Sequence, residues 1–138
     1  MTPEALLAEF RRQVRLAQKD GGPFDITERV GLVHRTYPEN PEWDGATIES
    51  PLGLGDDEEQ IEAAIAAEVD FFTGRGQAFE WKTYADDEPA DLVDRLVRHG
   101  FEAGDVEVVM LGEAADLVDD IAAPEGVRIR EFAGEDWE

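Results

Sequence analysis

The 138-residue sequence predicts an α/β fold in which helices flank a mixed sheet. Three observations lead to this prediction. Apolar residues recur at helical spacing in three segments, short alternating runs lie between those segments, and Gly and Pro separate the two kinds. The expected order is helix, two strands, helix, strand, helix, strand, which requires at least one parallel crossover.

The first helix is predicted to begin at Thr2-Pro3, with Thr2 as the N-cap and Pro3 at the first helical position. Gly21-Gly22-Pro23 ends it. One face is apolar and is formed by Leu6, Phe10, Val14 and Ala17. The same helix carries a cluster of basic residues, so we expect it to lie against the acidic remainder of the chain; these are Arg11, Arg12, Arg15 and Lys19.

The next segments predict a hairpin. Residues 28–37 (ERVGLVHRTY) alternate and are expected to form one strand, and residues 46–50 a second, joined by a long turn region. A glycine-bearing loop follows at Leu52–Gly55. A helix then begins at Asp57, because Asp57 and Gln60 have capping-box spacing, and it ends at Gly74 or Gly76. Its expected core face is Ile61, Ile65, Val69 and Phe72.

The second half of the chain predicts a strand, a helix and a further strand. Residues 79–84 (FEWKTY) form the first strand, with Phe79, Trp81 and Thr83 on one face. A helix is expected from Asp86–Pro89 to His99, ended by Gly100-Phe101. Its inward residues are predicted to be Leu92, Val93, Leu96 and Val97, and the strand that follows it alternates through Val106, Val108 and Met110.

The sequence changes character after Gly112. We expect residues 1–113 to form one domain, residues 114–126 a linker, and residues 127–138 the first strand of a following domain that this chain does not contain. The alternating run Val127–Phe132 after Pro124-Glu125-Gly126 motivates this division. A terminal edge strand in the same sheet is the alternative.

The charge balance restricts the class of partner. The sequence has 34 acidic and 12 basic residues, a net charge of −22, and no basic residue lies between Arg35 and Arg75. Such a surface repels nucleic-acid phosphates and anionic membranes. It favours either simple solubility or attraction of a cationic substrate such as an amine. With no cysteine, no apolar run of about 20 residues and no signal peptide, we expect a cytoplasmic protein.

Two positions are candidates for binding or chemistry on residue type alone. Glu80 and Lys82 point to one face of a strand, where Glu80 is either a general base for an amine or an ion-pair partner of Lys82. Trp43, among carboxylates, either holds a cation over its ring or is buried against the sheet. His34 and His99 lack metal-ligand spacing, so no metal site is expected.

Residues 78–101 (AFEWKTYADDEPADLVDRLVRHGF) resemble a stretch of bacterial GNAT-superfamily proteins with two tandem halves. In these proteins the degenerate N-terminal half has a similar FEWK strand, acidic-Pro helix start and Gly-Phe helix end. A catalytic GNAT domain follows, and its first strand is similar to Val127–Phe132. The resemblance implies a GNAT-like, mostly antiparallel sheet and the substrate-side half of an acetyl-CoA-dependent N-acyltransferase. Its partner would be a C-terminal GNAT domain in cis or another copy of the chain.

The resemblance also implies where a cofactor would bind. In the family, a Q/R-x-x-G-x-G/A turn at a helix N-terminus cradles the CoA pyrophosphate. Here the segment Ser50-Pro51-Leu52-Gly53-Leu54-Gly55 keeps Gly53 and Gly55, but Ser50 replaces the basic or amide residue and four carboxylates follow. Carboxylates occupy the capping donors and repel a second anion. We therefore expect a degenerate loop and no cofactor for this chain alone.

The resemblance leaves three functional alternatives. Tyr84 would donate a proton to the departing thiolate in a minimal active acyltransferase, with Glu80 as base, or it would make only an aromatic contact. The chain would otherwise be the inactive half described above. The alternative from a different class is a stand-alone acidic interaction module that binds a basic partner or a cationic small molecule.

Overall fold

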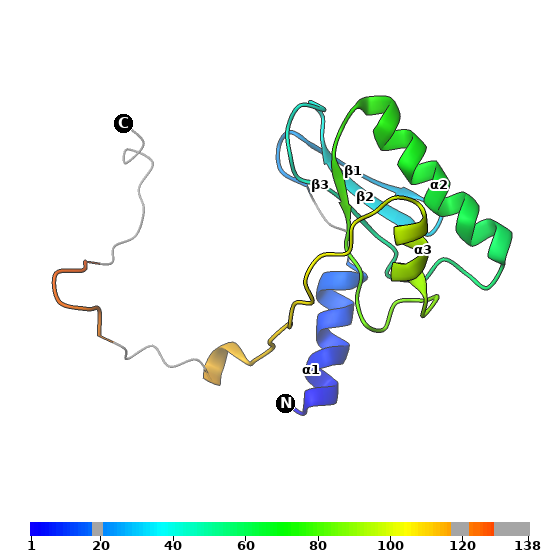
Figure 1. Ribbon diagram of the computed structural model, residues 1–138. Coiled ribbons are helices and arrows are strands. Elements are labelled where there is room, and N and C mark those ends of the chain that lie inside the picture. The colour runs from blue at the N-terminus through cyan, green and yellow to red at the C-terminus, as the bar shows by residue number, and fades with distance from the viewer. Residues whose placement is uncertain (18–20, 117–121, 129–138) are drawn as a thin grey trace.

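The computed structural model describes residues 1–17, 21–116 and 122–128 (Figure 1). Its four-stranded sheet has the order β1-β2-β3-β4. The first three strands pair antiparallel, and β3 and β4 pair parallel. The strands are β1 Asp25–Val30, β2 Val33–Pro38, β3 Ala46–Glu49 and β4 Phe79–Trp81. The predicted α/β class, with a mixed and mostly antiparallel sheet flanked by helices, is therefore confirmed.

Three α-helices accompany the sheet within the described residues: α1 Pro3–Phe10, α2 Glu58–Arg75 and α3 Leu92–Arg98. The long helix α2 connects β3 to β4 and is thus the predicted parallel crossover (Figure 1). As expected, Asp57 caps α2, with its Oδ1 accepting the Gln60 N–H at 2.8 Å. Gly76, at φ +62°, ends the helix.

The N-terminal helix follows the prediction at its start and departs from it after Phe10. Thr2 Oγ1 accepts the Ala5 N–H at 3.2 Å, which confirms the N-cap. Residues 11–15 then form a π-helical turn, with the Leu16 N–H bonded to the Arg11 carbonyl at 2.8 Å. A wider turn rotates the following side chains. Arg15 is consequently buried, whereas Val14 is 42% exposed, so the predicted apolar face is wrong at Val14.

The single strand predicted over residues 28–37 is wrong. The chain turns at Gly31-Leu32, and the Val30↔Val33 pair closes a hairpin of β1 and β2. Gly31 has φ +60°, a conformation that glycine adopts without steric cost. One isolated glycine is a weak turn signal, and the alternation of apolar residues continues on both sides of it. The strand predicted over residues 46–50 is confirmed as β3, paired with β2.

The hydrophobic core lies between one face of the sheet and the helices α2 and α3. Phe72 is fully buried and stacks on Phe79 at 4.4 Å between ring centroids, and Phe101 packs edge-on against Phe79 at 5.2 Å. The buried apolar residues are Val33, Tyr37, Ala46, Ile48, Leu54, Ile61, Ile65, Phe72, Trp81, Leu92 and Leu96. Of the predicted α2 face, only Val69 is less than fully buried, and Glu68 is buried beside it.

Helix α3 is shorter than predicted. Residues 86–91 form a loop that includes the cis peptide Glu88–Pro89, and the helix begins only at Leu92. Leu92 and Leu96 are buried as expected, but Val93 and Val97 are 44% and 48% exposed, which corrects their inward assignment. A helix of two turns covered on one side buries only one stripe. The Gly100-Phe101 stop is confirmed by a 3.1 Å bond from the Phe101 N–H to the Leu96 carbonyl.

The strand predicted over residues 106–110 is wrong, because this segment pairs with no strand among the described residues. Val106, Val108 and Met110 are 97%, 84% and 90% exposed. Residues 114–116 form one 3₁₀ turn, and the expected linker continues into residues 117–121, outside the described residues. The strand expected at 127–132 lies mostly outside them as well. No helix in the described part of the chain is long and apolar enough to cross a membrane.

Candidate functional site

The glycine loop between β3 and α2 is closed by its own chain. Gly53 and Gly55 have φ of +75° and +88°. The Gly53 N–H donates to the Ser50 carbonyl at 2.9 Å, and the Leu54 N–H donates to the Glu88 carbonyl at 3.1 Å. A Cβ placed on Gly53 would lie 3.0 Å from Glu88 Cβ. The two N–H groups that would face a phosphate are therefore already paired, and residue 88 covers the loop.

The N-terminus of α2 is occupied by acidic side chains. Asp57 accepts the Gln60 N–H, so one free helix donor is already satisfied. Glu58 follows and binds Arg95 of α3, with Oε1 and Nη1 separated by 2.7 Å. Negative side chains complement the positive end of the helix dipole. An anionic ligand would have to displace or approach these carboxylates, which disfavours its binding.

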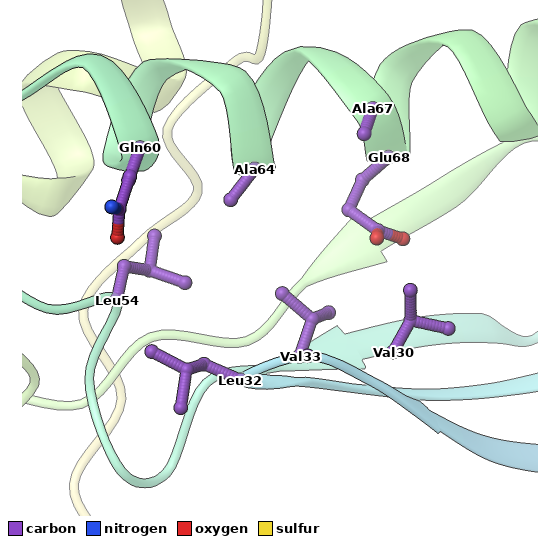
Figure 2. Close-up of a pocket in the computed structure, with 9 residues that line it drawn as sticks. Val30, Leu32, Val33, Leu54, Gln60, Ala64, Ala67 and Glu68 are labelled. Atoms are coloured by element: carbon purple, nitrogen blue, oxygen red, sulfur yellow. The ribbon is translucent and has the colours of Figure 1, made fainter.

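A groove of about 240 Å³ lies between the β1–β2 turn and α2 (Figure 2). Figure 2 shows Leu32, Val33 and Leu54 on one side, facing Ala64 and Ala67 on the helix. The short alanine side chains leave the space between the two layers. The groove is mainly apolar, and its carboxylate, on Glu68, is bonded to Arg35 (see below). It therefore offers room for an aliphatic group but no available base or nucleophile.

Arg35 lies at the centre of a buried ionic network. Its Nη2 donates to Glu68 Oε1 at 2.9 Å and its Nη1 to Glu28 Oε1 at 3.0 Å. Burial by itself would lower the pKa of Arg35, but the hydrogen bonds to Glu68 and Glu28 raise it overall. Burial, together with the hydrogen bond to Glu28, raises the pKa of Tyr37. These groups are fully engaged with one another and hold the sheet to α2.

The opposite face of the sheet is polar. The strand register places His34 beside Glu49 and Thr36 beside Thr47. Glu49 is only 6% exposed. Sequence reasoning considered His34 only for metal-ligand spacing and did not indicate this neighbour, because the contact depends on the pairing of two strands. The space lined by these four residues is about 10 Å³, the volume of roughly one water. A substrate does not fit there.

The structure places Glu80 on the same polar face, next to Thr47 across the strands. The Glu80 and Lys82 side chains are 64% and 44% exposed, and Oε2 lies 3.3 Å from Nζ. The ion pair considered from the sequence is present. The hypothesis of a general base required a partly buried Glu80, and the exposed side chain does not meet that requirement.

Tyr84 lies against the N-terminal segment. The Arg15 guanidinium stacks over its ring at 3.8 Å, and the Phe10 ring lies 6.0 Å away. Arg15 Nη2 also donates to Asp87 Oδ1 at 2.6 Å. The expected contact between the basic helix and the acidic remainder is therefore confirmed here. The Tyr84 ring serves as a packing surface for it.

Trp43 is partly exposed and has an aromatic neighbour that the sequence did not indicate. Its ring meets Phe24 edge-on at 5.9 Å, and the two side chains are 49% and 62% exposed. One backbone hydrogen bond joins the two segments, from the Glu39 N–H to the Phe24 carbonyl at 2.9 Å. The Trp43 N–H donates to the Asn40 carbonyl at 3.1 Å within the turn that carries Trp43. The pair forms an aromatic surface beside the carboxylates of residues 39–44.

These features define a small α/β domain with a closed glycine loop, an apolar groove and an acidic, aromatic surface. No group of three metal-ligating side chains is arranged to hold an ion within the described ranges. Comparison of the chain with protein-family models, with curated proteins and with solved structures found no match.

Proposed function

We propose that this chain is the substrate-side, structural half of a GNAT-type N-acyltransferase of the cytoplasm and does not itself bind acetyl-CoA. Three features support the family part of the proposal. They are the segment 78–101, the mixed sheet with a parallel crossover, and the glycine loop at the start of the crossover helix. The catalytic half would come from a C-terminal GNAT domain or from another copy.

One observation supports the proposal that the chain does not itself bind acetyl-CoA. The Leu54 N–H is bonded to the Glu88 carbonyl, and residue 88 leaves no space above Gly53. A pyrophosphate at this loop would need both the N–H group and that space. Binding would therefore require the loop at residues 86–91 to move away.

The cofactor part is tested by titrating acetyl-CoA into the full chain, with heat of binding and thermal midpoint as readouts. We expect no saturable signal. A ligand that binds only the folded state would raise the free energy of unfolding and therefore the thermal midpoint. A saturable shift that disappears in a Gly53→Val variant would show that the loop does bind the cofactor, and would contradict the proposal.

The family part is tested by the sequence encoded after Glu138. A Q/R-x-x-G-x-G/A loop within about 100–200 residues would support the tandem arrangement. A stop codon directly after Glu138 would remove the in-cis half and favour the interaction module described next.

A second candidate function is the binding of a basic partner or cationic small molecule, and the Phe24–Trp43 pair favours it. Exposed aromatic rings beside carboxylates attract cations in two ways, because a cation is drawn both to the face of the ring and to the negative charge of the carboxylates. A lysine-rich peptide with a fluorescent label is a suitable probe. Replacing Trp43 with Leu should weaken its binding about two- to fivefold. Leu52→Ala, at a site 56% exposed, is the matched control. Equal affinities of the two variants for the peptide would show that it binds by non-specific charge attraction alone.

A further inference from the structure

The segment Val106–Leu111 (VEVVML), here termed the free segment, exposes apolar side chains with strand-like alternation. Val106, Val108 and Met110 are almost fully exposed, and Val109 and Leu111 are 53% and 41% exposed. Each buried CH₂ group contributes about 0.8 kcal/mol, so leaving this run in water is unfavourable. Exposed apolar side chains gathered in this way mark an interaction surface.

The backbone of the free segment is also available. Among the described residues, no backbone hydrogen bond joins residues 102–112 to the rest of the chain. The segment contains no proline. Its N–H and C=O groups can therefore form a ladder with the edge of a sheet.

The outer edge of β4 is the complementary surface. β4 is the last strand of the sheet, and the Lys82 N–H donates to the Ile48 carbonyl of β3 at 2.9 Å. Because backbone groups alternate in direction along a strand, those of Phe79 and Trp81 point away from β3. The opposite edge, β1, carries charged side chains that protect it from pairing, namely Asp25, Glu28 and Arg29.

The free segment leads away from β4 of its own chain. At one end, Phe101 packs on Phe79 and Trp81 at 5.2 and 6.2 Å. At the other end, Glu113 forms an ion pair with the N-terminal amino group of Met1. Figure 1 shows residues 102–116, in yellow to orange, running away from the sheet toward the N-terminal end of α1. A second copy presents the same outer edge of β4, which is the last strand of the sheet.

We propose that the free segment of one chain adds as a strand to the outer edge of β4 in a second copy. Exchange in both directions gives a closed dimer in which both free segments and both edges are covered. Glu107 of the free segment and Lys82 beyond β4 carry opposite charges, whereas the chains as a whole each carry −22. This inference does not depend on the acyltransferase assignment.

Sedimentation equilibrium of the full chain tests the dimer. We expect a monomer–dimer equilibrium that strengthens several-fold between about 0.05 and about 0.5 M salt, because salt screens like charges. Val108→Lys should weaken dimerisation at least tenfold and leave the thermal midpoint of the dilute monomer unchanged, since Val108 contacts little in one chain. Val97→Lys, at a valine on α3 that is 48% exposed, should have no effect. A wild-type chain that stays monomeric at millimolar concentration would overturn the proposal.

Disulfide trapping identifies the acceptor strand, and the chain has no cysteine of its own. Oxidation of a mixture of Lys82→Cys and Val108→Cys chains should give a covalent heterodimer in high yield. A mixture of Val97→Cys and Val108→Cys should give little. The double variant Lys82→Cys/Val108→Cys, oxidised at low protein concentration, tests whether the segment docks within one chain. An intrachain disulfide in this variant would show that the segment docks on its own β4, contrary to the proposal.

Discussion

Arg35 of β2 and Glu68 of α2 form a two-point ion pair beneath the helix, with Nη2 and Oε1 separated by 2.9 Å. The two residues are only 7% and 2% exposed. The Arg35 guanidinium also lies 3.9 Å from the centre of the Phe71 ring. This contact joins the sheet to its crossover helix, and it explains why a charged residue occupies the helix face that sequence periodicity assigned to apolar residues.

Removing one partner of this pair is predicted to be strongly destabilising. Arg35→Ala leaves Glu68 buried without its counter-charge, so the free energy of unfolding should fall by about 3–5 kcal/mol. The double replacement Arg35→Met/Glu68→Leu should cost much less. Urea unfolding measures both. Lys82→Ala, which breaks the exposed pair with Glu80, should cost less than about 1 kcal/mol. Equal effects for Arg35→Ala and Lys82→Ala would contradict this assignment.

The Arg15–Asp87 ion pair is predicted to hold the N-terminal segment to the domain. Both side chains are buried, with 4% and 2% of their surface exposed. Arg15→Ala should therefore cost about 3 kcal/mol and speed amide exchange across residues 3–15. Arg12→Ala removes a guanidinium that is 67% exposed and that pairs with Glu9 one turn earlier, so it serves as the control. Unchanged exchange in Arg15→Ala would show that the segment is held by other contacts.

Glu62 is predicted to make stability depend on acid pH. Hydrogen bonds from His99 and Arg95 hold the pKa of Glu62 below its ordinary 4.5. Since the folded pKa is the lower one, this contribution is present above pH 4.5 and is lost as the pH falls through the folded value. Glu62→Gln should lower the thermal midpoint near neutral pH, and the difference from wild type should shrink as the pH falls below 4.5.

Thermal midpoints over this pH range measure the effect. Glu59→Gln, on the exposed side of the same helix, provides the control for loss of one negative charge. A constant difference between Glu62→Gln and wild type at every pH would show that lost packing, rather than the ionised carboxylate, is responsible.

The cap of α2 is predicted to stabilise the helix without guarding a cofactor site. Asp57→Ala frees the Gln60 N–H and should cost about 1 kcal/mol in urea unfolding. It should not produce acetyl-CoA binding, because the Leu54–Glu88 contact remains. Asp56→Ala is the neighbouring control and should change stability by less than about 0.5 kcal/mol. Cofactor binding that appears with Asp57→Ala would mean that charge alone kept the loop empty.

Sequence reasoning succeeded where the chemistry is local. The caps at Thr2 and Asp57, the glycine stops at Gly76 and Gly100, and the strand 46–49 each depend on residues a few positions apart. It failed for short elements whose structure depends on the residues that pair with them or pack against them. Gly31 makes a turn because β1 and β2 pair, and Val93 and Val97 stay exposed because one side of α3 faces the core.

The sequence by itself determined the α/β class, the crossover helix, the strong negative charge and the presence of a glycine loop. Only the tertiary structure decided that Glu88 closes this loop, that His34 lies beside Glu49, and that residues 106–111 pair with no strand in the described part of their own chain. The physical reason is the range of the interactions. Capping and turn preferences act within a few residues, whereas loop closure, strand register and burial depend on residues that only folding brings together.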